Sequence, residues 1–499
     1  MNLNLLILIP LLTAVALLPM KGLRQVRIVA VTGAAIQLIL SLVLLYCYWQ
    51  QRSGGNNDMM LFEEYHTWFT SLNINYHIGV DGISVSMILL TAFVVLAGVL
   101  VSWKMERLNK EFFFLLLLLS LGAYGFFISL DLFTLFFFLE VAVIPKFLLI
   151  GIWGSGKKEY SAMKLALMLM GGSALVFVGL AGLHFSTNTG DGTLTYDMVL
   201  ISKMHIPVEA QKFFFPFAFI GFGIFTALFP FHTWVPDGHS SAPTAASMFL
   251  AGISMKLGGY GCLRVAVMLM PQAAEYYSTS IIILASIAIL YGAFATMMQT
   301  DLKYINAYSS VSHCGFVLLG IGMLTKTAVT GAVMQMVSHG LMTALFFACI
   351  GMIYDRTHTR QVKQLGGLLK MMPFISTVFV IAGLCSLGLP GFSGFVAEMT
   401  VFMGSWQNAD AFYRIATIIA CASIVVTAVY ILRAVGKVIM GPLENNDHKL
   451  LSDAAWNEKL AAGLLIIGII AIGVAPFWLN ELIKPGTEVI MKNIGAVIK

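Results

Sequence analysis

The chain has 499 residues, of which 59% are hydrophobic and only 11% charged, and its mean hydropathy is +0.88. Because an ordinary soluble domain is roughly one-quarter charged, this composition excludes a soluble multidomain enzyme and predicts an all-α integral membrane protein. The net charge of +5 is too small and too scattered to suggest a nucleic-acid-binding surface.

Apolar runs along the chain predict about 14 transmembrane helices, since one crossing takes about 20 residues. The longest connections, about 50–80, 185–212 and 441–459, are too short to fold alone. We expect helices near residues 3–20, 27–49, 82–103, 112–130, 132–153, 162–184, 213–232, 243–269, 278–299, 304–323, 327–351, 373–403, 412–440 and 460–481.

The basic residues give a test of this arrangement that does not depend on hydropathy. Of the 29 lysines and arginines, eighteen fall on one face in this arrangement, eight on the other, and three remain unplaced. Since basic loops tend to stay inside, the bias predicts both ends of the chain on the outer side, which is the periplasm for a bacterial inner membrane.

Two of the predicted helices contain residues that interrupt a helix. Pro230 removes a backbone donor near the end of the seventh helix, and Pro236 does so just after it. Pro390 removes one among three glycines in the twelfth helix. Interrupted helices at corresponding places indicate inverted repeats with an ion path between them. We therefore expect two inverted five-helix repeats, with the chain divided into residues 1–110 (helices 1–3), 111–270 (helices 4–8), 271–440 (helices 9–13) and 441–499 (an inner loop and helix 14).

Among the ionisable residues inside predicted helices, where burying a charge costs about 2.5 kcal/mol or more, four stand out. A lone charged side chain reaching for the interface is the alternative explanation, and it is strongest for Lys146. If they do not reach the interface, these ionisable residues are candidate functional groups. The four are Glu140, Lys146, Lys256 and Glu398.

Four histidines lie within or at the ends of predicted helices: His232, His239, His313 and His339. Each alone is more often a hydrogen-bonded interior residue than a proton carrier. Together with the buried lysines and glutamates they form a sparse polar series in apolar helices, which is typical of a proton relay.

No redox or nucleotide site is indicated by the sequence. The six cysteines lie singly in apolar stretches, without a CxxC or a Cys/His cluster, and no GxGxxG after a strand, GxxxxGK[ST] or GxSxG occurs. We expect no cofactor and no metal in this chain.

The polar residues lie in motifs that resemble those of the antiporter-like membrane subunits of respiratory complex I (NADH:quinone oxidoreductase), most of all subunit M, the bacterial counterpart of mitochondrial NADH dehydrogenase subunit 4. The family pattern HxWLPDxHxxAPT occurs here with Val235 in place of its leucine. A glutamate at position 398 also resembles subunit M. The matching stretches are 79–84, 232–245, 256–261, 301–303, 307–316, 338–341 and 387–391.

The resemblance implies a subunit that translocates protons without redox chemistry, driven by quinone reduction elsewhere in the complex. It implies partners in the membrane (L-like, N-like and small subunits) and a peripheral NADH-oxidising arm. FMN, iron–sulfur clusters and quinone are expected in those partners. An Mrp-type cation/proton antiporter subunit is the alternative, and the sequence does not distinguish H⁺ from Na⁺.

The resemblance also assigns roles. Glu140 matches the family's helix 5 glutamate, Lys256 its helix 8 lysine, and Glu398 the acid at the proton outlet. His313 and His339 match the family's polar residues that lie between that lysine and that acid.

One departure is clear, because Phe225 stands where the family has the lysine that pairs with the helix 5 glutamate, and Ala227 where it has a proline. Lys146 is the candidate replacement. Six residues on an ideal helix give about 9 Å of rise and 240° of rotation, so pairing with Glu140 needs a bend such as one at Pro145.

Overall fold

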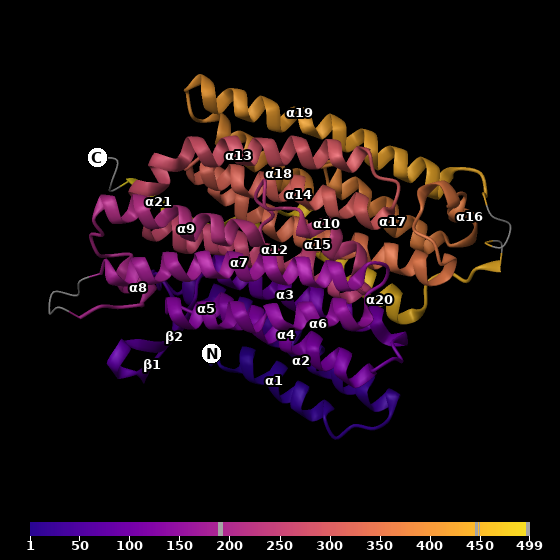
Figure 1. Ribbon diagram of the computed structural model, residues 1–499, viewed down its shortest axis with the longest axis horizontal. Helices are drawn as coiled ribbons and strands as arrows, with labels where there is room; N and C mark the ends of the chain where they lie inside the picture. Colours follow the sequence, from indigo (N-terminus) through magenta and orange to yellow (C-terminus); the bar gives the residue numbers. More distant parts are fainter. Residues whose placement is uncertain (188–192, 445–447, 449, 496–499) are drawn as a thin grey trace.

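The computed structural model describes residues 1–187, 193–444, 448 and 450–495. Most of these residues form helices that run side by side in one bundle (Figure 1). Ten helical segments in these ranges are long and apolar enough to cross a membrane, which confirms a multi-pass helical membrane protein. The count of fourteen crossings, the inverted repeats and the four-part division remain predictions. Parts of two predicted connections and of the last division, residues 188–192, 445–447, 449 and 496–499, lie outside the described residues.

The N-terminal part contains a β-hairpin where hydropathy indicates only a connection. Its strands pair antiparallel, with Tyr65 opposite His77, and aromatic residues favour such strands. Asn73 ends the link between them with a φ of 49°, a conformation that asparagine tolerates. The elements are α1 (Leu5–Leu17), α2 (Leu23–Ser53), β1 (Leu61–Phe69), β2 (Ile74–Val80) and α3 (Gly82–Val101).

In the next part of the chain, an aspartate caps the start of one helix, and two predicted helices are interrupted. Asp131 accepts hydrogen bonds from the N–H groups of Phe133 and Thr134, at 2.9 and 3.2 Å. The predicted helix 132–153 is divided at Ala142, and the predicted helix 213–232 ends at Phe225, before Pro230. The elements are α4 (Asn109–Ile128), α5 (Leu132–Val141), α6 (Val143–Trp153), α7 (Lys158–Phe185), α8 (Met198–Ile201), α9 (Val208–Phe225) and α10 (Trp234–Ser241).

The central helices are the most deeply buried. The predicted helix 243–269 alternates between α-helical and π-helical turns, and π-helical turns are rare and frequent at functional sites. Its segments are α11 (Thr244–Phe249), the π-helical Leu250–Ser254, α12 (Met255–Gly261) and the π-helical Cys262–Val267. It is followed by α13 (Pro271–Met297), α14 (Leu302–Gly322) and α15 (Lys326–Thr357).

The C-terminal part contains the second predicted break and one break that was not predicted. The predicted helix 373–403 is discontinuous, as expected, because Gly388 and Gly391 turn the chain at positive φ values of 73° and 97°. The predicted helix 460–481 is wrong as a single element, since Pro476 has no N–H and separates two helices. The elements are α16 (Leu368–Met371), α17 (Pro373–Ser386), α18 (Ser393–Trp406), α19 (Ala411–Ala434, continued by the π-helical Val435–Met440), α20 (Trp456–Val474) and α21 (Phe477–Gly495).

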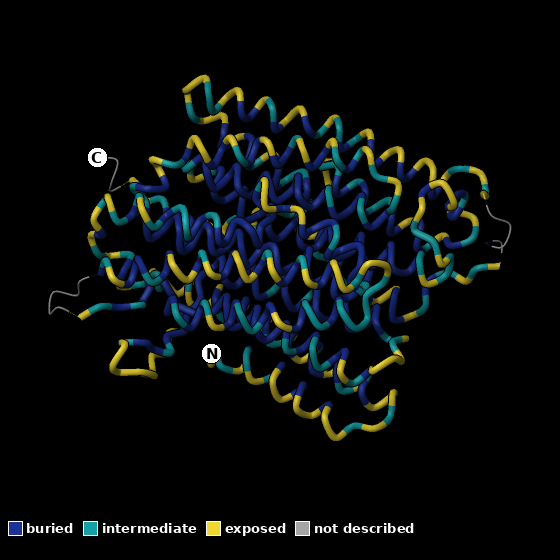
Figure 2. Tube along the Cα trace, viewed as in Figure 1, coloured by how far each residue is buried: buried dark blue, intermediate teal, exposed yellow. Residues whose placement is uncertain are grey.

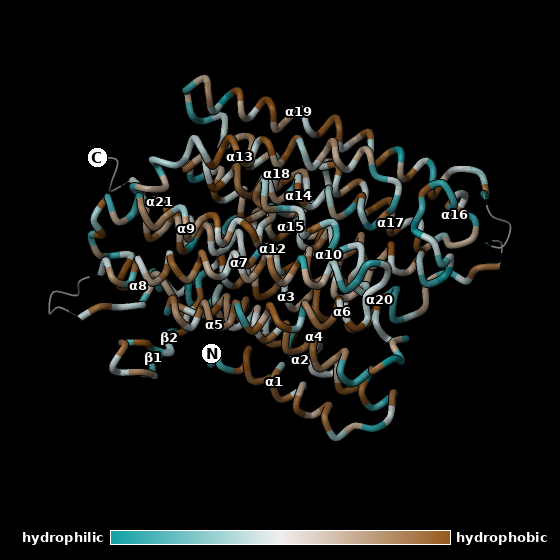
Figure 3. The backbone as a smooth tube through the Cα atoms, viewed as in Figure 1, coloured by the Kyte–Doolittle hydropathy of each residue, from teal (hydrophilic) through white to brown (hydrophobic). Residues whose placement is uncertain are grey.

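Burial and hydropathy divide the bundle into a core and a lipid-exposed shell. Outer helices such as α1 and α19 are exposed in Figure 2 and hydrophobic over much of their length in Figure 3. The hairpin, α8 and α21 lie toward the left of Figure 1, and α16 lies toward the right. We refer to these two ends of the bundle as the hairpin face and the opposite face.

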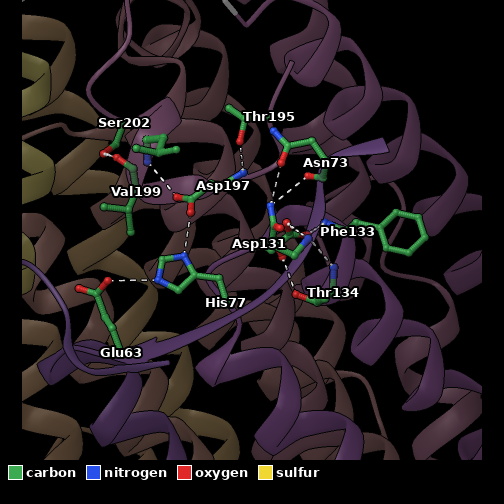
Figure 4. A network of polar contacts seen from close by, with 12 residues as sticks. Glu63, Asn73, His77, Asp131, Phe133, Thr134, Thr195, Asp197, Val199 and Ser202 are labelled. Atoms are coloured by element: carbon green, nitrogen blue, oxygen red, sulfur yellow. Dashed lines mark hydrogen bonds and ion pairs between the residues drawn. The ribbon is translucent and has the colours of Figure 1, made fainter. Parts of the chain in front are cut away.

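A histidine holds the hairpin to the bundle. His77 Nδ1 lies 2.8 Å from Asp197 Oδ2 and its Nε2 lies 3.1 Å from Glu63 Oε2 (Figure 4). Burial lowers the pKa of the imidazole, but the hydrogen bonds and charges of Asp197 and Glu63 outweigh it and raise the pKa to about 9. The protonated imidazole therefore links β1 to the start of α8.

This link makes the stability of the hairpin dependent on pH. A group whose folded-state pKa is raised contributes its full stability below the unfolded value of about 6.5 and loses it as the pH rises through the folded value. We expect the hairpin to open more readily above pH 9, with faster amide exchange in β1 and β2 after correction for the intrinsic pH dependence. His77→Gln should remove this change, and the same change in that variant would contradict the assignment.

Candidate functional site

A line of buried polar side chains crosses the centre of the bundle. Lys256 Nζ lies 2.7 Å from His339 Nδ1, and the His339 ring centroid lies 5.4 Å from that of His313. His313 Nδ1 in turn lies 3.2 Å from Glu398 Oε1. All four side chains are buried, and they come from α12, α15, α14 and α18, whose labels gather near the middle of Figure 1. We refer to Lys256, His339, His313 and Glu398 as the central line.

The π-helical turn before Lys256 helps to position its ammonium group. A helical side chain points back toward the N-terminus of its helix, so Lys256 reaches over this turn and donates to the carbonyl of Ala251. That carbonyl and His339 hold the ammonium group within an apolar core.

The break between α17 and α18 positions the other end of the central line. Gly388 lies in this break, and a Cβ atom there would stand 2.7 Å from Glu398 Oε2. The chain therefore passes directly against the carboxyl group. Ser386 Oγ, at the end of α17, lies 3.1 Å from His313 Nε2. The broken helix thus contacts both Glu398 and His313.

Toward the opposite face, His239 lies near enough to two lysines for their charges to act on it. It is fully buried, its ring stacks on Phe347 with centroids 5.0 Å apart, and the charges of Lys256 and Lys303 both act on it. Lys303 Nζ donates to the carbonyl of Ala242 at 2.7 Å. Both ring nitrogens of His239 are buried without a hydrogen-bond partner among the described residues.

Lys303 also lines a cavity of about 830 Å³ at the opposite face, together with Lys104, Glu106, Asp355 and Arg356. Lys303 is buried, although it lies just before the predicted helix 304–323, where a basic residue is expected in a connection. The available signal was its position two residues after Asp301, which caps α14 and so places Lys303 inside the first helical turn.

Glu140 and Lys146 form a separate group. Lys146 is 1% exposed, its Nζ lies 5.7 Å from the ring centroid of Phe225, and the Glu140 charge acts on it. The helix that carries both residues is interrupted at Ala142, between α5 and α6, and not at Pro145. In the described part of the chain, neither Lys146 Nζ nor Glu140 Oε1 has a hydrogen-bond partner.

His232 is the one predicted residue that stands apart. It lies between α9 and α10, and its ring contacts Phe229 and Tyr291, with centroids 5.5 and 4.8 Å away, rather than another of the predicted site residues. The seven other predicted residues occur in the central line, beside it at His239, or in the Glu140 and Lys146 group.

Metal chemistry has no support in the geometry. Within residues 1–187, 193–444, 448 and 450–495, no group of three or more His, Cys, Asp or Glu side chains is arranged to hold a metal ion. What the central line offers is a series of groups that can take up and release protons.

The chain is similar to a known family and to named proteins of bacteria. Residues 129–433 match the family described as NADH:quinone oxidoreductase/Mrp antiporter, TM. A Picosynechococcus sp. protein named NAD(P)H-quinone oxidoreductase chain 4 2 is 35% identical over 506 aligned residues, covering 100% of this chain and 94% of that protein. NADH-quinone oxidoreductase subunit M of Rickettsia typhi is 34% identical, covering 90% of this chain and 89% of that one.

Solved structures share the fold over nearly the full length. A chain of respiratory complex I from Thermus thermophilus with bound NADH has a TM-score of 0.89 and 25% identity, covering 99% of this chain and 100% of that chain. A chain of the Mrp complex from Dietzia sp. has a TM-score of 0.82 over 99% of this chain and 98% of that chain, but its 18% identity shows the fold alone.

Proposed function

Because the chain belongs to the family of membrane subunits shared by NADH:quinone oxidoreductase and Mrp antiporters, we propose that it is the subunit M-type, proton-translocating subunit of a bacterial NADH:quinone oxidoreductase. The observation that carries this proposal is the direct contact sequence from Lys256 through His339 and His313 to Glu398. Such groups are costly inside a membrane and are retained where they move ions.

The proton path begins at the opposite face. Water in the cavity lined by Lys303 delivers protons to His239, which passes them to Lys256. From there His339 and His313 lead to Glu398, on the part of the broken helix nearer the hairpin face. Protons leave toward that face, which is the periplasmic side in this proposal.

Glu140 and its cation, Lys146, control the step at Lys256. A change in charge or separation at this pair alters the electrostatic free energy of a proton held on Lys256, since charges act on each other strongly at low dielectric. Quinone reduction in partner subunits supplies the driving force. This chain carries out no redox step in the proposal, and FMN, iron–sulfur clusters and quinone belong to its partners.

The proposal extends to the surroundings of the chain, and the named relatives support it. We place the chain in a bacterial inner membrane with both ends periplasmic, beside L-like, N-like and small membrane subunits and below the NADH-oxidising arm. The Mrp-type antiporter subunit is the second candidate, because the chain shares its fold with a chain of the Dietzia complex.

Affinity purification tests the assignment. The chain is tagged, extracted gently from its native membrane, and its co-purifying subunits are identified by mass spectrometry. We expect the flavin and iron–sulfur subunits of an NADH dehydrogenase. Recovery of small antiporter-type membrane subunits alone would instead assign the chain to the Mrp class.

A further inference from the structure

A second pair of buried charges lies away from the central line. Asp81 and Arg264 contact each other through Oδ2 and Nη2, and each side chain is 1% exposed. Asp81 caps α3, where its Oδ1 accepts the N–H of Ser84 at 3.0 Å. Arg264 lies in the π-helical segment that follows α12. The pair therefore joins α3 to the helix that carries Lys256, on the side toward the hairpin face.

Polar groups connect the region of Lys256 to this pair. Lys256, Tyr260 and Arg264 recur every four residues and so lie on one side of their helix. Tyr260 Oη lies 2.8 Å from Ser84 Oγ, and Arg264 Cζ lies 5.6 Å from the centroid of the Tyr260 ring. Tyr260, Ser84, Asp81 and Arg264 thus form a polar route that does not include Glu398.

The polar route continues to the hairpin face. Tyr48 Oη lies beside Gly82, the residue after Asp81, and accepts a hydrogen bond from Arg52 Nε at 3.1 Å. Arg52 is partly exposed at the end of α2, where it also donates to the carbonyl of Asp58. Polar groups thus lead from the region of Lys256 toward the hairpin face by a second path, separate from the central line.

We propose that the Asp81–Arg264 pair is an electrostatic barrier that prevents protons on Lys256 from leaking along the polar route to the hairpin face. The proposal rests on the role of Lys256 as a proton store. A relay needs groups that both accept and release protons, and arginine does not release one. Protonation of Asp81 would leave the Arg264 charge unpaired in a buried site, which is strongly unfavourable.

A purely structural role explains the pair less well. Charges need not be buried to join two helices, since well-packed neutral groups often stabilise a core as well or better. The site is also tightly closed by α21, because a Cβ atom at Gly486 would stand 2.3 Å from Asp81 Oδ2. A permanent charge in such a closed site repels an approaching proton, as arginines do in channels that exclude protons.

Two variants test the barrier. Arg264→Lys keeps the ion pair but introduces a group that can release a proton. The double variant Asp81→Asn, Arg264→Gln removes both charges and leaves neither one buried without its partner. Arg360→Lys is the matched control, because Arg360 forms a partly buried ion pair with Asp301 at 3.3 Å near the opposite face, away from the polar route.

The measurement is the passive proton flux into vesicles that contain the purified assembly, driven by an imposed pH difference without NADH. We expect both Arg264 variants to raise the flux several-fold and Arg360→Lys to leave it unchanged. A flux at the wild-type level in both Arg264 variants would overturn the barrier. If the double variant does not assemble, the flux measured with Arg264→Lys alone tests the barrier.

Adding Lys256→Met separates this inference from the proposed function. In the Arg264→Lys background, it should return the flux to the wild-type level, because the leak starts from Lys256. Persistence of the leak would show a path that avoids Lys256 and would overturn the barrier as stated. The proposed function is tested by a different readout, NADH-driven pumping in the single Lys256→Met variant.

Discussion

Lys256→Met is expected to abolish the proton translocation carried by this subunit while the peripheral arm continues to oxidise NADH. Methionine is close to lysine in length but carries no charge and donates no hydrogen bond, so His339 loses the group 2.7 Å from its Nδ1. The measurement is the number of protons pumped per NADH oxidised by the purified assembly in sealed vesicles. An unchanged ratio would refute the role of Lys256.

Two control variants make the result specific. Lys363 is exposed near the opposite face, so Lys363→Met tests the same chemical change away from the central line and should leave the ratio unchanged. Lys256→Arg keeps the positive charge but cannot release a proton. It should therefore fail like the methionine variant, and normal pumping by Lys256→Arg would mean that the site needs only a charge.

The sequence predicts most of the membrane helices because their apolar length is a local property. It also places the breaks near Pro230 and Pro390, since proline removes a backbone donor wherever it occurs. The hairpin at residues 61–80 is missed because its residues are a mixture of polar and aromatic types within a short connection. Its anchor, His77, depends on Asp197, which is distant in sequence.

The site residues are predictable by type but not by arrangement. An ionisable residue in an apolar helix stands out in the sequence, which identifies Lys256 and Glu398. Their order in the central line depends on how four helices pack, so no local pattern distinguishes His313, which lies in the line, from His232, which does not. Arg264 is equally prominent in the sequence, but its partner Asp81 is revealed only by the packing of α3.

Lys146→Met is expected to reduce proton pumping several-fold, because Glu140 would lose the cation that it pairs with in the proposed mechanism. The location of Lys146 favours this result, since its Nζ lies over the ring of Phe225, the residue in the place of the family's lysine. The ammonium group thus reaches the same region from α6 that a lysine on α9 would occupy. NADH-driven pumping by the purified assembly is again the measurement, and a normal ratio of protons to NADH would mean that Lys146 is only a buried structural residue.

Rescue provides the stricter test of this relocation. Phe225→Lys in the Lys146→Met background returns the lysine to the helix where the family carries it. If the requirement is a cation between Glu140 and Lys256, pumping should recover in the double variant, although Phe225→Lys alone, with two buried cations and one carboxylate, should impair it. If the double variant pumps no more protons per NADH than Lys146→Met, the position of the lysine on α6, and not only its charge, is required. The two lysine positions would then be alternative solutions that cannot be exchanged within one packed core.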